Sequence, residues 1–297
     1  MFDKSFSKAW EASFWNFATF DYITSYSTRS NPRLDFTDAR LWQAAGLPMA
    51  SKDGQYVPKL LVENVSPNGP EKMTETESCR VLVWIVIRTL ASVATASARG
   101  PTIKAEGIGQ ALELDCWRDI EDHLNRWHSA IPDTFELLSR VTSTKQDPMD
   151  LDFSYSSASS SPTSIPFPQL FFTNSMATSA LLLYHFTCLL VLLQRIPGHP
   201  SDMASPGASP DMSRVSYHAE EICGIATGRP QIEAQVHLLQ PLHLAGLCLE
   251  SYQQKVVLAD LLVGLQRRNG CATVWKLKEL KRVWGWETDI VQRGIMV

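Results

Sequence analysis

LFFTNSMATSALLLYHFTCLLVLLQ, residues 170–194, contains the most apolar stretch of this chain, at 180–193. Apolar side chains would point in almost every direction around a helix here, which predicts a central helix covered by other helices. The stretch 180–193 is shorter than the roughly 20 residues that cross a membrane, and it contains His185 and Thr187. We therefore expect a buried core helix rather than a membrane helix.

Helical periodicity is clear outside this segment too. The cleanest amphipathic pattern lies at 107–129, with charged side chains expected to face water between apolar positions spaced by three or four residues. The apolar positions are Trp117, Ile120, Leu124 and Trp127. A first helix over 7–25 is expected to present one apolar face that carries Trp10, Phe14 and Phe17 and is widened by Phe20 and Tyr22.

Further helices are expected along the rest of the chain. They lie at 37–45, 75–98, 211–228, 231–252, 255–268 and 273–284. A strand is conceivable at 81–87, but the length of the segment and its alanine-rich end favour a helix. Pro241 should kink or split the helix at 231–252. Gly228 is expected at the C′ position of one helix, and Asn269-Gly270 should end another.

The expected fold is all-α, because no strongly alternating strand is evident and no Asn-Gly type of hairpin turn separates two strands. We expect one regulatory domain over 1–297, made of two helical halves at about 7–141 and 169–286. The segment 142–168 joins them and is rich in Ser and Pro, which predicts a flexible linker.

Composition excludes several classes of protein. The chain has 297 residues, with 27 Lys and Arg against 31 Asp and Glu, so a broad basic surface for phosphate binding is not expected. The six cysteines have no Cys-x2-Cys spacing, and the sequence predicts free, mostly buried thiols without a zinc site. They are Cys79, Cys116, Cys188, Cys223, Cys248 and Cys271.

No arrangement of residues predicts catalysis. A nucleophile elbow, a His-Glu-x-x-His helix and a phosphate-binding glycine loop are all missing from the sequence. His123 and His128 would diverge by about 140° on a helix, so they should not share a metal ion. Pro241 separates His237 from His243, which leaves their geometry open. We predict no catalytic, cofactor-binding or metal-binding residue, and no cofactor.

Five short motifs in order resemble the regulatory domain of fungal zinc-cluster transcription factors. The first has Phe14-Trp15, Asp21, Asn31-Pro32-Arg33 and Leu41-Trp42, and the second has Trp127-His128 before Ile131-Pro132. The third is Tyr184-His185. The fourth runs from Ile222 to Ala226 and continues with Gln240-Pro241-Leu242 and Ala245-Gly246. The fifth has Gly270, Thr273 and Trp284-Gly285-Trp286.

The resemblance covers about 14–286 and implies a nuclear regulator of metabolic genes that is not an enzyme and does not bind a membrane. The family's six closely spaced zinc-binding cysteines are not found in this sequence. We therefore expect action through protein partners: a DNA-binding paralogue, coactivators or a second copy. Two alternatives remain open. The chain could be part of a DNA-binding activator whose zinc-cluster exon lies upstream, or a helical sensor that binds a small-molecule effector in an aromatic pocket.

Overall fold

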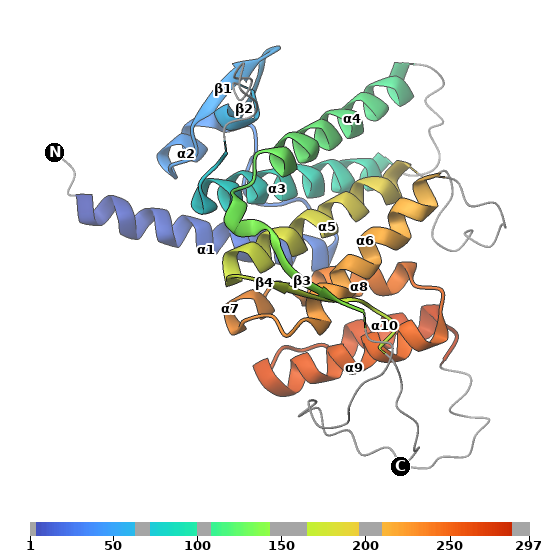
Figure 1. The fold of residues 1–297 in the computed structure, drawn as a ribbon. Helices are drawn as coiled ribbons and strands as arrows, with labels where there is room; N and C mark the ends of the chain where they lie inside the picture. Colours follow the sequence, from blue (N-terminus) through green and yellow to red (C-terminus); the bar gives the residue numbers. More distant parts are fainter. Residues whose placement is uncertain (1–3, 63–71, 100–107, 143–164, 196–209, 287–297) are drawn as a thin grey trace.

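The computed structural model describes residues 4–62, 72–99, 108–142, 165–195 and 210–286, and in these ranges it is mostly helical (Figure 1). The fold is therefore all-α, as predicted. The helices are α1 (Lys4–Thr28), α2 (Ala39–Ala44), α3 (Glu75–Arg99), α4 (Ile108–Ser129), α5 (Ser175–Arg195), α6 (Pro210–Thr227), α7 (Ile232–Gln235), α8 (Leu239–Cys248), α9 (Tyr252–Asn269) and α10 (Val274–Val283). Two single 3-10 turns are Lys59–Leu61 and Asp133–Phe135.

Helix α5 lies at the centre, as its sequence predicts. It packs against α3, α4, α6, α7 and α8, and side chains from Ala177 to Leu192 are buried on nearly every side (Figure 1). By length and composition alone, α3 and α5 could each cross a membrane, but 78% of the α5 window is buried inside the protein and 50% of the α3 window. The burial of α5 is that of a core helix.

The amphipathic prediction for α4 is confirmed, because Trp117, Ile120, Leu124 and Trp127 are all buried. The prediction for α1 is confirmed for Phe14 and Tyr22, which are buried, and wrong for Trp10, Phe17 and Phe20, which are exposed. The buried stripe of α1 runs through Phe14, Ala18 and Tyr22, one residue per turn, and it faces the core. Trp10 and Phe17 are 38% and 42% exposed.

Two small antiparallel sheets correct the expectation that the chain has no strands. The first pairs β1 (Met49–Lys52) with β2 (Gln55–Pro58). Its loop is Asp53-Gly54, and both residues have positive φ, 51° and 80°. Asp-Gly is a strong signal for a two-residue hairpin turn, so the sequence contained the evidence for this sheet.

The second sheet pairs β3 (Leu137–Val141) with β4 (Gln169–Phe172), across the expected linker. Leu170 was expected in the central helix, and this is wrong: Leu170 is a buried strand residue. The helix begins later because the Asn174 side chain accepts a hydrogen bond from the Ala177 backbone N–H at 2.7 Å, as a helix N-cap does.

Proline and glycine set the remaining boundaries. Pro241 does split the predicted helix: α7 ends before it, and Pro241 sits in the first turn of α8, where a missing N–H costs nothing. Gly270 ends α9 with φ 66°, as predicted. Gly228 follows α6, but the left-handed residue there is Arg229 with φ 56°. Gly228 is instead needed because a Cβ would lie 1.8 Å from the Leu170 carbonyl oxygen of β4.

Buried side chains from both predicted halves belong to one continuous core, from Phe14 in α1 to Leu280 in α10. The strand pairing of β3 with β4 also joins the two halves. Most of the predicted linker, residues 143–164, lies outside the described residues. At its end Phe167 is buried, so this part of the predicted linker contributes to the core.

Candidate functional site

Two tyrosines one turn apart on α1 bind two histidines of the C-terminal helices. Tyr22 hydrogen-bonds to Nδ1 of His237, and Tyr26 Oη lies 3.0 Å from Nδ1 of His243. His237 follows α7 and His243 lies in α8, so the break before Pro241 lets both rings face α1. These contacts fasten the end of α1 to the C-terminal helices.

A charged cluster continues from His243 to α10. We call Arg29, His243, Lys276 and Glu279 the α1–α10 cluster. Glu279 Oε1 accepts a hydrogen bond from Arg29 Nη2 at 3.0 Å. Glu279 Oε2 lies 3.2 Å from His243 Nε2 and 3.6 Å from Lys276 Nζ. A single carboxylate therefore serves two cationic side chains and one imidazole.

Lys276 is buried, with 4% of its side chain exposed. Its ammonium lies over the rings of Trp275 and Tyr26, 4.2 Å and 5.2 Å from their centroids. Lys276, Lys278, Lys281 and Arg282 are close together in the sequence, a spacing that by itself is typical of one solvated basic helix face. The structure corrects this, because Lys276 points inward while Lys278 and Arg282 are exposed.

Burial and charge set the protonation of the α1–α10 cluster. Burial, assisted by Lys276, lowers the pKa of His243 to about 4, although Glu279 opposes this shift. Burial also lowers the pKa of Lys276, partly offset by Glu279. Burial would raise the pKa of Glu279, but His243, Lys276 and Arg29 outweigh it and hold that pKa below its usual range. At neutral pH, His243 is therefore uncharged beside an ionised Glu279.

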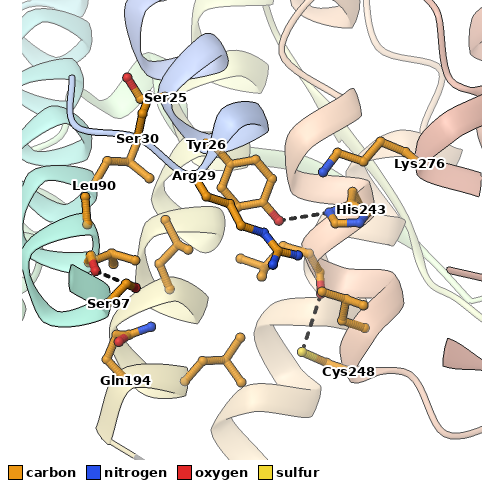
Figure 2. A pocket seen from close by; sticks show the side chains of 16 residues that line it. Ser25, Tyr26, Arg29, Ser30, Leu90, Ser97, Gln194, His243, Cys248 and Lys276 are labelled. Carbon is orange, nitrogen blue, oxygen red and sulfur yellow. Dashed lines mark hydrogen bonds between the residues drawn. The ribbon is translucent and has the colours of Figure 1, made fainter. Parts of the chain in front are cut away.

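The α1–α10 cluster borders a cavity of about 510 Å³ between α1, α3, α5, α8 and α10, which we call the interhelix cavity. Figure 2 shows Arg29, His243 and Lys276 at one side of it, with Gln194 and Cys248 farther along. Much of the wall is apolar and comes from α3, α5 and α8. These apolar residues are Leu90, Val93, Ala94, Leu190, Leu193, Leu244 and Leu247.

A second group of histidines lies between α5 and α6. Nδ1 of His185 and Nδ1 of His218 are 2.9 Å apart in the core, and the Tyr184 ring lies against both imidazoles. Burial, then His218, lowers the pKa of His185 well below its usual value. Burial, then Arg214, lowers the pKa of His218 to about 4. Both rings are thus neutral near pH 7, which is compatible with one donating to the other.

Among the described residues, no group of three or more His, Cys, Asp or Glu side chains is placed to bind a metal ion. His123 and His128 do diverge: His123 contacts Arg88 of α3, and His128 lies against Tyr184 of α5. Asp119 of α4 forms an ion pair with Arg88.

All six cysteines are free thiols, as predicted. Cys188 and Cys223 are buried, and the other four are half-buried. Burial raises the pKa of Cys79, Cys188 and Cys248, each to about 12. The thiols that line or approach the core are therefore protonated, and they are weak nucleophiles and weak metal ligands.

Motifs that are far apart in the sequence meet in the structure. Trp127 of the second motif stacks on Tyr184 of the third, with ring centroids 5.4 Å apart. Trp284 of the fifth donates its indole N–H to the Gly246 carbonyl of the fourth at 2.8 Å. Glycine allows this close approach of α8 to α10, because a Cβ at position 246 would lie 2.9 Å from the Leu280 side chain. These motif residues therefore form packing contacts between helices that are distant in the sequence.

Comparisons with known proteins agree with the resemblance found in the sequence. The family described as "Fungal specific transcription factor domain" matches residues 4–287. A similar protein is "Transcription activator AMTR1" of Alternaria alternata, 24% identical over 290 residues. That alignment covers 94% of this chain and 36% of the relative, so the chain spans about a third of the relative's length. No solved structure matches the chain.

Proposed function

Because this chain belongs to the fungal-specific transcription factor domain family, we propose that it regulates transcription in the nucleus through protein contacts of its helical domain. The domain itself catalyses no reaction. We also propose that residues 1–297 act as one domain, with the two helical halves joined by the shared core and the β3–β4 pairing. Metabolic genes are the proposed targets, on the strength of the resemblance.

The family match over 4–287 is the observation that carries this proposal. Motif residues such as Trp127 and Trp284 form packing contacts, and the described residues offer no metal centre for a DNA-binding zinc cluster. Recognition of DNA is then the work of another segment of a longer protein or of a separate partner. Because the relative extends well beyond the matched part, both routes stay open.

A tethering experiment tests the regulatory role. Residues 1–297 are fused to an unrelated DNA-binding domain, and a reporter with the matching operator is measured in a fungal host. We expect reporter output to change by several-fold relative to the DNA-binding domain alone. A fusion that carries Gly228→Val, in which the side chain collides with the Leu170 carbonyl, is the unfolded control. A well-folded fusion that leaves the reporter unchanged would contradict the proposal.

A binding experiment tests the DNA part. The purified chain is expected to show no sequence preference for promoter fragments at physiological salt. Specific affinity in the usual range of about 10⁻⁸ M or tighter would show that these residues read DNA themselves. Mapping the 5′ end of the native transcript then tells whether a zinc cluster is encoded in frame upstream.

A further inference from the structure

The interhelix cavity combines an apolar wall with the cationic side chains of Arg29 and Lys276. We propose that it binds a small molecule with an apolar body and one carboxylate, with the carboxylate beside Lys276 and Arg29 (Figure 2). The binding itself follows from the cavity. Its use as a regulatory signal rests on the proposed function in transcription.

The size and the walls of the cavity favour a small organic molecule. Its volume, about 510 Å³, lies within the range of roughly 300–1,000 Å³ that ligand pockets span. Leucines from three helices form its apolar side, among them Leu90, Leu190 and Leu244. An apolar body would therefore be removed from water against α3, α5 and α8, which is the main source of affinity in such pockets.

Charge selects the polar end of the ligand. Arg29 and Lys276 both line the cavity, and no carboxylate is among the lining residues that the structure describes. Glu279 is shared between the two cations, at 3.0 Å from Arg29, whose side chain is 81% exposed, and at 3.6 Å from the buried Lys276. Two positive charges therefore face one carboxylate, and the one that lies away from water is that of Lys276. One anionic group on the ligand would restore neutrality.

Hydrogen bonding points to the same place. Nε2 of His243 is buried and has no hydrogen-bond partner of good geometry, although Glu279 lies 3.2 Å away. Nδ1 of the same ring is occupied by the Tyr26 hydroxyl at 3.0 Å. If Tyr26 donates to Nδ1, then Nε2 carries the proton and can donate it to a carboxylate oxygen. The nearest acceptor of this N–H is the shared Glu279 carboxylate, and an anionic ligand group beside Lys276 could accept from it as well.

The position of the cavity gives the ligand a physical effect. Its walls come from α1, α3, α5, α8 and α10, so a bound molecule contacts elements from both predicted halves of the domain. A carboxylate that binds Lys276 and Arg29 would add to the junction of α1 with α10, where Glu279 binds Arg29 and the Lys276 ammonium lies over the Tyr26 ring. Ligand binding would then stabilise the folded domain.

The test compares three probes that share one chain length: octanoate, octanol and octylamine. Binding to the full chain is measured by titration calorimetry and by the thermal unfolding midpoint. We expect octanoate to bind at least tenfold more tightly than octanol or octylamine. Lys276→Met should weaken octanoate by about tenfold or more, since a charge-assisted contact is lost, and leave octanol unchanged. Lys278→Met, on the exposed face of the same helix, is the matched control and should change neither.

A second variant tests the place of binding without touching a charge. Ala94 lines the cavity on α3, so Ala94→Phe should fill it and abolish binding of octanoate. Ala98→Phe, on the exposed part of α3, should bind octanoate like the parent chain. Circular dichroism and the unfolding midpoint without probe show whether each variant is folded.

Several results would overturn the site. One is equal affinity for octanoate and octanol. A second is octanoate binding that survives Ala94→Phe. The third is no octanoate binding at a probe concentration of roughly 1 mM, which corresponds to a binding free energy weaker than about −4 kcal/mol. The reporter fusion separates this inference from the proposed function. If octanoate binds but the fusion leaves reporter output unchanged, the ligand site stands and the proposed regulatory role is refuted. If the fusion changes reporter output but octanoate does not bind, the regulatory role stands and the ligand site is refuted.

Discussion

Asp21 binds the backbone of Arg33: its Oδ1 accepts the Arg33 N–H at 3.0 Å. The other carboxylate oxygen accepts the Leu34 N–H at 2.9 Å, and Asp21 is only 5% exposed. The contact fixes the direction of the chain after α1 ends. Asp21 and Asn31-Pro32-Arg33 belong to the same motif of the family resemblance, so that motif has a structural cause.

We expect Asp21→Asn to lower the free energy of unfolding by about 2 kcal/mol. The amide keeps one acceptor oxygen but places an N–H₂ group opposite one of the two backbone donors, so a buried donor loses its partner. Urea unfolding followed by circular dichroism measures the change. Asp122→Asn, an exposed position on α4, is the control and should stay within about 0.5 kcal/mol of the parent chain. Equal stability of the two variants would contradict the role of Asp21.

Gly228→Ala should destabilise the domain by several kcal/mol. An added Cβ would lie 1.8 Å from the carbonyl oxygen of Leu170, and that atom belongs to strand backbone that cannot rotate away. The strand must therefore move off α6, and the β3–β4 sheet should loosen with it. Amide hydrogen exchange of β3 and β4, together with urea unfolding, measures both effects.

Gly264→Ala is the matched control for Gly228. Gly264 lies inside α9, and its nearest neighbour is the flexible end of Arg268 at 3.2 Å. Alanine in a helix interior is worth about 0.5–1 kcal/mol over glycine, and the Arg268 side chain has to shift by only a few tenths of an ångström to admit the Cβ. The control should therefore be neutral or slightly more stable. If Gly228→Ala behaved like Gly264→Ala, the close approach of β4 to α6 would be wrong.

Local patterns predicted most of the helices because their signals lie within a few residues. The spacing of Trp117 and Ile120, the position of Pro241 and the glycine after Asn269 each act on a single turn of the chain. The first sheet was not predicted, although Asp53-Gly54 is a strong signal for a hairpin turn. The strand at Leu170 was missed because an apolar run fits a buried helix and a buried strand equally well. Its partner, β3, lies on the other side of the Ser- and Pro-rich segment, so no pattern within a few residues of Leu170 indicates the pairing.

The candidate site could not be predicted in the same way. Lys276 lies among other basic residues on a short amphipathic helix, and only packing against Tyr26 and Glu279 turns it inward. Tyr22 and Tyr26 carry the expected helical spacing, but their partners His237 and His243 follow more than 200 residues later. Contacts between distant segments have no local signal, so pockets built from several helices appear only once the fold is known.

Buried thiols should resist alkylation. Cys223 is fully buried and burial raises its pKa, so it should stay unlabelled by iodoacetamide at pH 8 in the folded chain. Cys271, which is half-buried, should be labelled at least tenfold faster. Peptide mass spectrometry over a time course gives both rates. Labelling in urea is the control and should make the two rates similar. Rapid labelling of folded Cys223 would show that the α6 core opens readily.

Acid should weaken the domain through its buried histidines. The pKa of His218 is lowered to about 4 by burial and then by Arg214 and His128, whereas an unfolded histidine titrates near 6.5. Between these values the unfolded chain binds a proton that the folded chain refuses. Stability is therefore complete above about pH 6.5, falls as the pH drops toward 4, and loses no more from this group below it. His218→Gln should reduce the pH slope of the unfolding free energy by up to about 1.4 kcal/mol per pH unit, measured in urea at a series of pH values.

His128→Gln, at an exposed position, is the control and should reduce this slope less than His218→Gln does. An unchanged slope in His218→Gln would show that His218 titrates normally in the folded chain.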